Sequence, residues 1–196
     1  MTHPVEPDLW HRLHIVEERV RKAVAARRSV DPDPDDPYRG QYLTPEAAQR
    51  VLDTRAEPSG TEPELSAEDT PLGRLARDFG LSPLDLDLLL VALAPDLDAR
   101  FEQLYGYLND DLTRRRPTVG LALELCGHTG LSPARFRLSP GAPLLAGGLL
   151  EVHEPERPPL SRVLTVPDRV TAHLLGDTAP DARLGSVLGE HTADPA

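Results

Sequence analysis

The chain has 196 residues, of which 21 are proline and only 4% are aromatic, so it can hold one or two domains but not a packed core throughout. A single cysteine, Cys126, excludes a disulfide framework and a cysteine metal cluster and is typical of the reducing cytoplasm, where we expect the protein. The net charge of −11 argues against strong non-specific binding to nucleic acid, and no apolar run is long enough for a membrane span.

The N-terminal segment, residues 1–30, is predicted to be an amphipathic helix because apolar side chains recur every three or four residues. This stripe consists of Leu9, Leu13, Val16, Val20 and Val24. Such stripes pack on their own domain more often than on a partner, but the sequence leaves both open. In the second case the partner contacts would be Leu9, Leu13, Val16 and Val20, and exchanging Leu13 and Val16 for aspartate would leave the fold intact.

Residues 31–69 are predicted to form an acidic, proline-rich linker with one short helix at residues 44–53. Prolines alternate with aspartates in DPDPDDP, which combines missing amide donors with like-charge repulsion. Thr44 followed by Pro45 is a typical helix start. Tyr38 and Tyr42 precede this helix, and we expect them to dock it on the main domain or to contact a partner.

The main domain is predicted to span residues 70–176. Its first three helices are expected at residues 70–79, 82–94 and 95–108. The middle helix carries large apolar residues on almost its whole circumference, which predicts burial on every side. We expect Pro95 to end it near Ala94, because proline lacks the amide hydrogen that continues a helix.

Short helices and a hairpin complete the prediction. Helices are expected at residues 118–126, 132–138, 143–147 and 167–175, and strands at residues 149–153 and 160–166, joined by the polar loop 154–159. Helices followed by strand, loop and strand are typical of a winged helix. The predicted fold class is therefore mainly α, a helical winged-helix domain with a short β-hairpin wing, and residues 177–196 are expected to be a flexible tail.

One long stretch also carries a family resemblance. PLGRLARDFGLSPLDLDLLLVALAPDLDARFEQLYGYLNDDLTRRRPTVGLALELCG, followed by PLLAGGLLEV and LSRVLTVPDRVTAHLLG, resembles the N-terminal winged-helix region of bacterial AAA+ ATPases, common in actinobacteria. These include the ATPase encoded with extracellular contractile injection systems. The resemblance covers about residues 9–176 and implies an ATPase module further along the same polypeptide.

The sequence itself predicts no catalysis. It contains no G-x-x-x-x-G-K-[ST] phosphate loop, and its one lysine, Lys22, lies in a predicted helix. Paired carboxylates such as Asp85 and Asp87 lie at helix ends, where capping explains them, and Cys126 is interpreted as a small buried apolar group. We therefore expect neither a cofactor nor a metal in this chain.

Two functions remain. The leading hypothesis is a non-catalytic recognition domain that selects a protein substrate or assembly partner for an AAA+ motor. The alternative is a DNA-binding winged helix, in which the phosphate contacts would be Arg114, Arg115, Arg116, Arg135 and Arg137. Glu154 and Glu156 argue against DNA, because they place negative charge on the expected wing.

Overall fold

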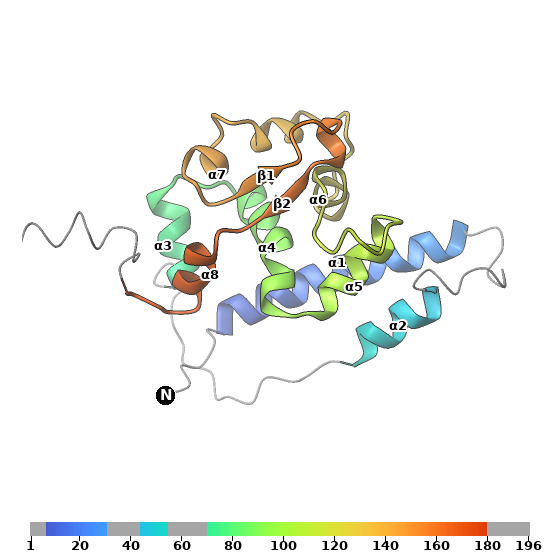
Figure 1. Ribbon diagram of the computed structural model, residues 1–196. Coiled ribbons are helices and arrows are strands. Elements are labelled where there is room, and N and C mark those ends of the chain that lie inside the picture. The colour runs from blue at the N-terminus through green and yellow to red at the C-terminus, as the bar shows by residue number, and fades with distance from the viewer. Residues whose placement is uncertain (1–6, 31–43, 55–69, 180–196) are drawn as a thin grey trace, which may run out of the picture.

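A computed structural model describes residues 7–30, 44–54 and 70–179 (Figure 1). The α-helices are α1 (Pro7–Val30), α2 (Pro45–Asp53), α3 (Pro71–Asp78), α4 (Pro83–Leu97), α5 (Arg100–Leu108), α6 (Val119–Leu125), α7 (Pro143–Ala146) and α8 (Asp168–Leu174). Two 3₁₀ helices, η2 (Pro133–Leu138) and η3 (Pro159–Ser161), and two strands, β1 (Glu151–His153) and β2 (Val163–Thr165), complete the described elements. The mainly helical fold class predicted from the sequence, with its small hairpin, is confirmed.

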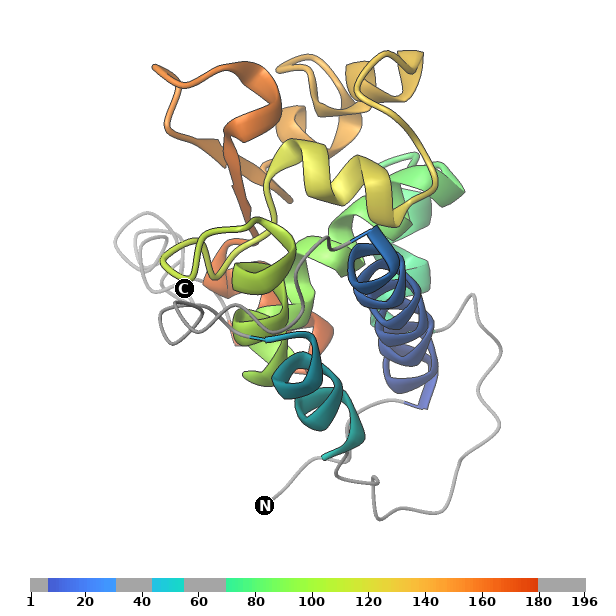
Figure 2. The same cartoon turned by 90° about the vertical axis from the view of Figure 1, so that its right-hand side faces the viewer.

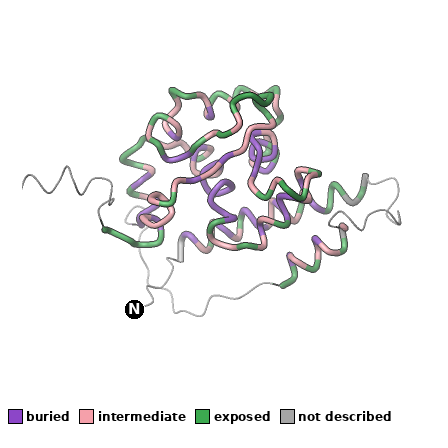
Figure 3. Tube along the Cα trace, in the orientation of Figure 1, coloured by how far each residue is buried: buried purple, intermediate pink, exposed green. Residues whose placement is uncertain are grey.

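Helix α4 lies at the centre of the described fold. Ser82 and Asp85 form a reciprocal capping box at its start: the Ser82 hydroxyl accepts from the Asp85 amide, and the Asp85 carboxylate accepts from the Ser82 amide. Its side chains from Leu88 to Ala94 are almost completely buried, as its all-round apolar pattern predicts. Helices α1, α5, α6 and α7 and strand β2 all pack against α4. Figure 3 shows the buried residues gathered along α4 and the facing sides of its neighbours.

Pro95 does not end α4, contrary to the prediction. The helix continues through Pro95 to Leu97, and α5 begins only at Arg100. Proline cannot donate to the carbonyl four residues earlier, that of Val91, and a buried carbonyl without a donor is costly. The hydroxyl of Tyr105 on α5 donates to this carbonyl at 2.8 Å and replaces the missing amide hydrogen. A tertiary contact thus keeps the helix intact beyond its proline.

This replacement predicts a conditional effect of Tyr105→Phe. With Pro95 present, the variant is expected to lose about 1–3 kcal/mol of unfolding free energy, because the buried Val91 carbonyl loses its donor. In a Pro95→Ala background the loss should be smaller, since the alanine that replaces the proline can donate its own amide hydrogen. Urea denaturation of the four proteins measures both losses. Equal losses in the two backgrounds would contradict the pairing.

The strands are shorter than predicted. Leu149 and Leu150 were expected in the first strand, but their amides both donate to the carbonyl of Leu144 and close the turn after α7. Residues 160 and 161 of the expected second strand belong to η3 instead. The remaining strands pair antiparallel, with Val152 opposite Leu164. Thr118, just before α6, adds an isolated bridge to Val163 and attaches α6 to the hairpin.

The hairpin and the short helices occupy one end of the fold, and α1 and α2 run side by side at the other (Figure 2). Helix α1 packs on α4, α5 and α6, so it belongs to the same packed body as the rest.

A cluster of charged side chains joins α1, α2 and α5. Arg100 donates to the Leu52 carbonyl at 3.4 Å and to Glu17 at 3.5 Å, and Arg21 pairs with Asp53 at 3.3 Å.

Candidate functional site

The segment between α6 and the hairpin holds η2 and α7, in the chain position where DNA-binding helix-turn-helix proteins with a wing carry their recognition helix. In those proteins the recognition helix is continuous and enters the major groove. Here it is broken into η2, which is a 3₁₀ helix of six residues, and α7, which has four. Pro133, Pro140 and Pro143 remove amide donors along the way. The segment therefore presents no helix long enough to lie along a groove.

Two large apolar side chains project from this broken segment, and we call them the apolar tip. Leu131 is 95% exposed and Phe136 is 67% exposed, whereas no other large apolar side chain among the described residues exceeds 40%. Leu131 lies in the turn before η2 and Phe136 lies on η2. Large apolar side chains that are this exposed are typical of protein contacts. The sequence predicts an ordinary helix over residues 132–138 and does not single these residues out, whereas η2 is a 3₁₀ helix in which Leu138 is buried and Phe136 is exposed.

An ion pair fixes η2 against α4. Arg137 donates from Nε to Oδ1 of Asp85 at 2.8 Å and makes a second bond to Oδ2. Asp85 is fully buried and also accepts from the amide and the hydroxyl of Ser82, each at 2.7 Å. Burial alone would raise the pKa of Asp85, but the hydrogen bonds from Arg137 and Ser82 outweigh it and hold that pKa below its usual value. Arg137, the residue after Phe136, thus anchors this part of the apolar tip to α4.

The predicted partner stripe on α1 lies inside the domain. Leu9, Leu13, Val16 and Val20 are between 0% and 5% exposed and belong to the core. The structure therefore favours the other possibility left open by the sequence, that the stripe packs on its own domain. The other two predicted contacts, Tyr38 and Tyr42, lie outside the described residues.

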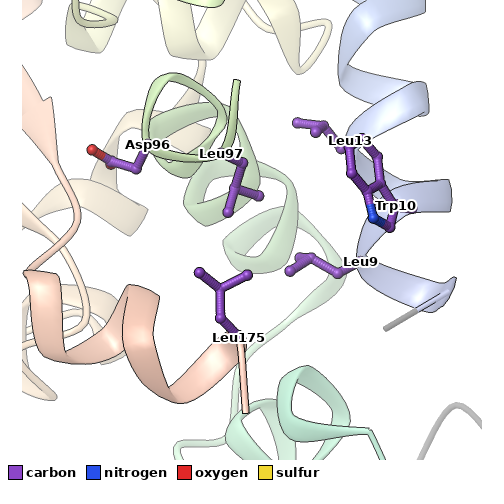
Figure 4. Close-up of a pocket in the computed structure, with 6 residues that line it drawn as sticks. All are labelled: Leu9, Trp10, Leu13, Asp96, Leu97 and Leu175. Carbon is purple, nitrogen blue, oxygen red and sulfur yellow. The ribbon is translucent and has the colours of Figure 1, made fainter. Parts of the chain in front are cut away.

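The first part of the stripe borders a pocket of about 190 Å³. The residues that line it are Leu9, Trp10, Leu13, Asp96, Leu97 and Leu175. Figure 4 shows Leu9, Leu97 and Leu175 pointing toward one another across the pocket, whereas Asp96 points away from them. The Asp96 carboxylate is bound by Arg116 through two bonds of 2.6 Å. The pocket is therefore mainly apolar.

A comparison with protein families assigns this architecture. A family model described as "Winged helix domain, variant" matches residues 8–188, which is most of the chain. The chain belongs to this variant winged-helix family. The matched residues include α1 from its second residue onward, α2–α8 and the hairpin. No match was found among curated proteins or among solved structures.

Winged-helix domains serve both DNA and protein recognition, so the state of the candidate basic residues matters. Arg114 donates to Asp111 at 3.2 Å and to the Ser161 carbonyl at 2.9 Å. Arg115 is the most exposed of these arginines and lies 3.5 Å from Glu102. Arg116 is held by both oxygens of Asp96. Each of the three is therefore beside a carboxylate.

The two candidate arginines on η2 are also engaged. Arg137 pairs with Asp85, and Arg135 donates to the Gly130 carbonyl at 3.1 Å. On the wing, Glu154 pairs with Arg157 at 2.9 Å, and Glu156 is exposed. Binding to DNA releases counterions in proportion to the phosphates that free cations neutralise. Four of the five candidate arginines are already paired with carboxylates and contribute little, whereas Arg135 bonds to a backbone carbonyl. The charges of the winged-helix domain therefore give little support to a DNA interface.

The surroundings of the remaining polar and reactive side chains are explained by the fold rather than by catalysis. Asp98, the residue after α4, accepts from the Arg100 amide at 2.9 Å, whereas the N-cap residue of α5, Ala99, makes no side-chain cap bond. Burial raises the pKa of the half-buried Cys126 to about 12, so it stays a thiol at neutral pH despite Arg19 at 3.9 Å. Within the described ranges, no group of three or more histidine, cysteine or acidic residues is placed to bind a metal. Nor is any helix in those ranges long and apolar enough to cross a membrane.

Proposed function

We propose that this variant winged-helix domain is a protein-recognition module that binds its partner through the apolar tip, Leu131 and Phe136. The single observation that carries the proposal is the exposure of these two side chains on the segment that replaces the recognition helix. In the same segment the basic side chains that DNA would need are bonded within the domain. The proposed recognition surface is therefore apolar rather than cationic.

The tip can supply binding energy at low cost. Burying a leucine or phenylalanine side chain contributes about 1.5–3 kcal/mol, and a few such anchors dominate most protein interfaces. Asp85 fixes η2 through Arg137, so little order must be gained when the partner binds. Leu160 on η3 lies against Gly130, immediately before Leu131, and extends the apolar surface toward the wing.

The sequence resemblance supports a setting for this module. We assign the domain to the N-terminal region of a cytoplasmic AAA+ ATPase, where it would select the substrate or the assembly partner of the motor. A contractile injection system is the setting that the resemblance favours. Hydrolysis of ATP would belong to the ATPase module of the parent polypeptide, and the domain would contribute recognition without a cofactor.

Charge placed on the tip tests this function. The double variant Leu131→Asp/Phe136→Asp is expected to lose capture of protein partners from a native lysate, because aspartate cannot be buried unpaired in an apolar interface. Its unfolding free energy should change by less than about 1 kcal/mol, since both side chains are exposed. Quantitative mass spectrometry of the captured proteins, with thermal melts of each variant, measures both effects.

The matched control is Leu131→Met/Phe136→Leu, which keeps the surface apolar and should retain capture. Equal capture by the aspartate and the control variants would refute the tip as the contact. Affinity for DNA that falls steeply with salt, unchanged in the aspartate variant, would favour the DNA alternative instead.

A further inference from the structure

The segment that carries the apolar tip differs in charge from the rest of the chain. Residues 125–150 contain no aspartate or glutamate, although the whole chain has 32 acidic residues and a net charge of −11. No other stretch of the chain without an acidic residue is as long. Figure 1 shows this segment along the upper edge of the fold, between α6 and β1. This edge therefore opposes a negatively charged partner less than the acidic remainder of the chain does.

Arg135 places a cation directly beside the tip. It precedes Phe136 in the chain, and its Nη1 donates at 3.1 Å to the carbonyl of Gly130, the residue before Leu131. The side chain of Arg135 thus extends from one tip residue toward the other. Among the described residues no carboxylate pairs with Arg135, in contrast to the other four candidate arginines.

The bond to Gly130 leaves most of the Arg135 guanidinium available. A guanidinium has five N–H donors in a fixed planar arrangement, and this bond uses one of them. The planar fork fits the two oxygens of a carboxylate, and a side chain that is already held in place loses little entropy on binding. Asp85 does not compete for Arg135, because that carboxylate is already bound by Arg137 and Ser82.

We propose that the apolar tip recognises an acidic, apolar segment of a protein, in which a carboxylate lies next to large apolar side chains. The carboxylate pairs with Arg135, and the apolar side chains pack on Leu131 and Phe136. This inference rests on the proposed function and adds the charge of the partner to it. DNA fits the same surface less well, because one guanidinium neutralises few phosphates and the two apolar side chains gain nothing from a phosphate backbone.

Selection from a phage-displayed library of random short peptides, with residues 1–196 as the bait, tests this charge preference. The wild-type chain is expected to enrich peptides that combine leucine, isoleucine or phenylalanine with aspartate or glutamate. Arg135→Glu should enrich lysine and arginine in place of the acids, because it reverses the charge beside the same apolar surface. The matched control Arg115→Glu, on an exposed arginine outside this segment, should select the same peptides as the wild type.

A double-mutant cycle measures the ion pair itself. Replacing the acidic residue of an enriched peptide with glutamine should weaken binding to the wild-type chain about tenfold, the size expected for one charge-assisted contact. The same replacement should have little effect on binding to Arg135→Gln, because that variant has already lost the charge. Fluorescence anisotropy of labelled peptides gives each affinity, and thermal melts show whether each variant is folded.

The outcomes separate the charge preference from the tip itself. Apolar peptides without acidic residues, or the same peptides selected by the wild-type chain and by Arg135→Glu, would overturn the inference and leave the tip as a contact. Peptides that bind Leu131→Asp/Phe136→Asp as well as the wild type, or no enrichment of apolar residues, would refute the proposed function too. Displacement of bound peptide by a DNA duplex, lost in Arg135→Glu, would assign Arg135 to phosphate instead of carboxylate.

Discussion

Replacing Leu13 and Val16 with aspartate is expected to unfold the domain. Both side chains are buried in the core, at 5% and 1% exposure, and each aspartate would bring an unpaired carboxylate into an apolar environment. Lost burial alone costs about 2 kcal/mol or more for each residue, and the buried charge adds to it. The sum exceeds about 5 kcal/mol, which is comparable to the whole stability of many domains. Circular dichroism and thermal melts measure the outcome.

The control for this variant lies on the same helix. Ile15, between the two core residues, is 40% exposed, so Ile15→Asp should cost no more than about 1–2 kcal/mol and leave a cooperative melt. A folded Leu13→Asp/Val16→Asp protein with the wild-type melting temperature would contradict the packing of α1. It would return the stripe to the role of an exposed partner surface.

Asp85→Ala is expected to cost about 3–5 kcal/mol and to loosen the apolar tip. The substitution removes the capping box of α4 and leaves Arg137 without its carboxylate. The comparison is Asp96→Ala, which breaks the more exposed pair with Arg116 and should cost about 1 kcal/mol or less. Urea denaturation gives both values. A cost for Asp85→Ala no larger than that for Asp96→Ala would contradict the anchoring role of Asp85.

The same carboxylate makes a predictable contribution to the pH dependence of stability. The pKa of Asp85 is lowered in the folded state, so the unfolded chain binds its proton more readily. Its stabilisation is therefore complete above the unfolded pKa, about 4, and is lost as the pH falls through the lower folded pKa. Asp85→Asn should remove this part of the acid sensitivity. An unchanged slope of stability against pH below about 4 would show that Asp85 does not carry it.

Local signals in the sequence predicted the helix starts well. Thr44, Thr70, Ser82, Thr118 and Ser132 each accept from an amide of the helix that follows. A hydroxyl before a first turn acts within three residues, so no knowledge of the tertiary structure is needed to recognise it. The apolar circumference of α4 and the alternation of the hairpin are also patterns within one segment, and they predicted the burial of α4 and the presence of the hairpin but not the length of its strands.

The features that were predicted wrongly depend on residues that are far apart in the sequence. The continuation of α4 through Pro95 requires Tyr105, which belongs to another helix. The bond that holds η2 on α4 joins Arg137 to Asp85, which are 52 residues apart. The periodicity of α1 showed an apolar face but not what covers it. Charge patterns likewise showed arginines without showing the carboxylates that neutralise them.

A photo-crosslinking amino acid at position 136 tests the central claim most directly. Benzoylphenylalanine replaces Phe136 with little change of shape, and the same group at position 15 on α1 serves as the control. After irradiation in cells that produce the protein natively, we predict a crosslinked species from position 136 that is protease-sensitive, nuclease-resistant and absent from position 15. Crosslinks to nucleic acid alone, or no crosslink that distinguishes position 136 from position 15, would contradict protein recognition through the apolar tip.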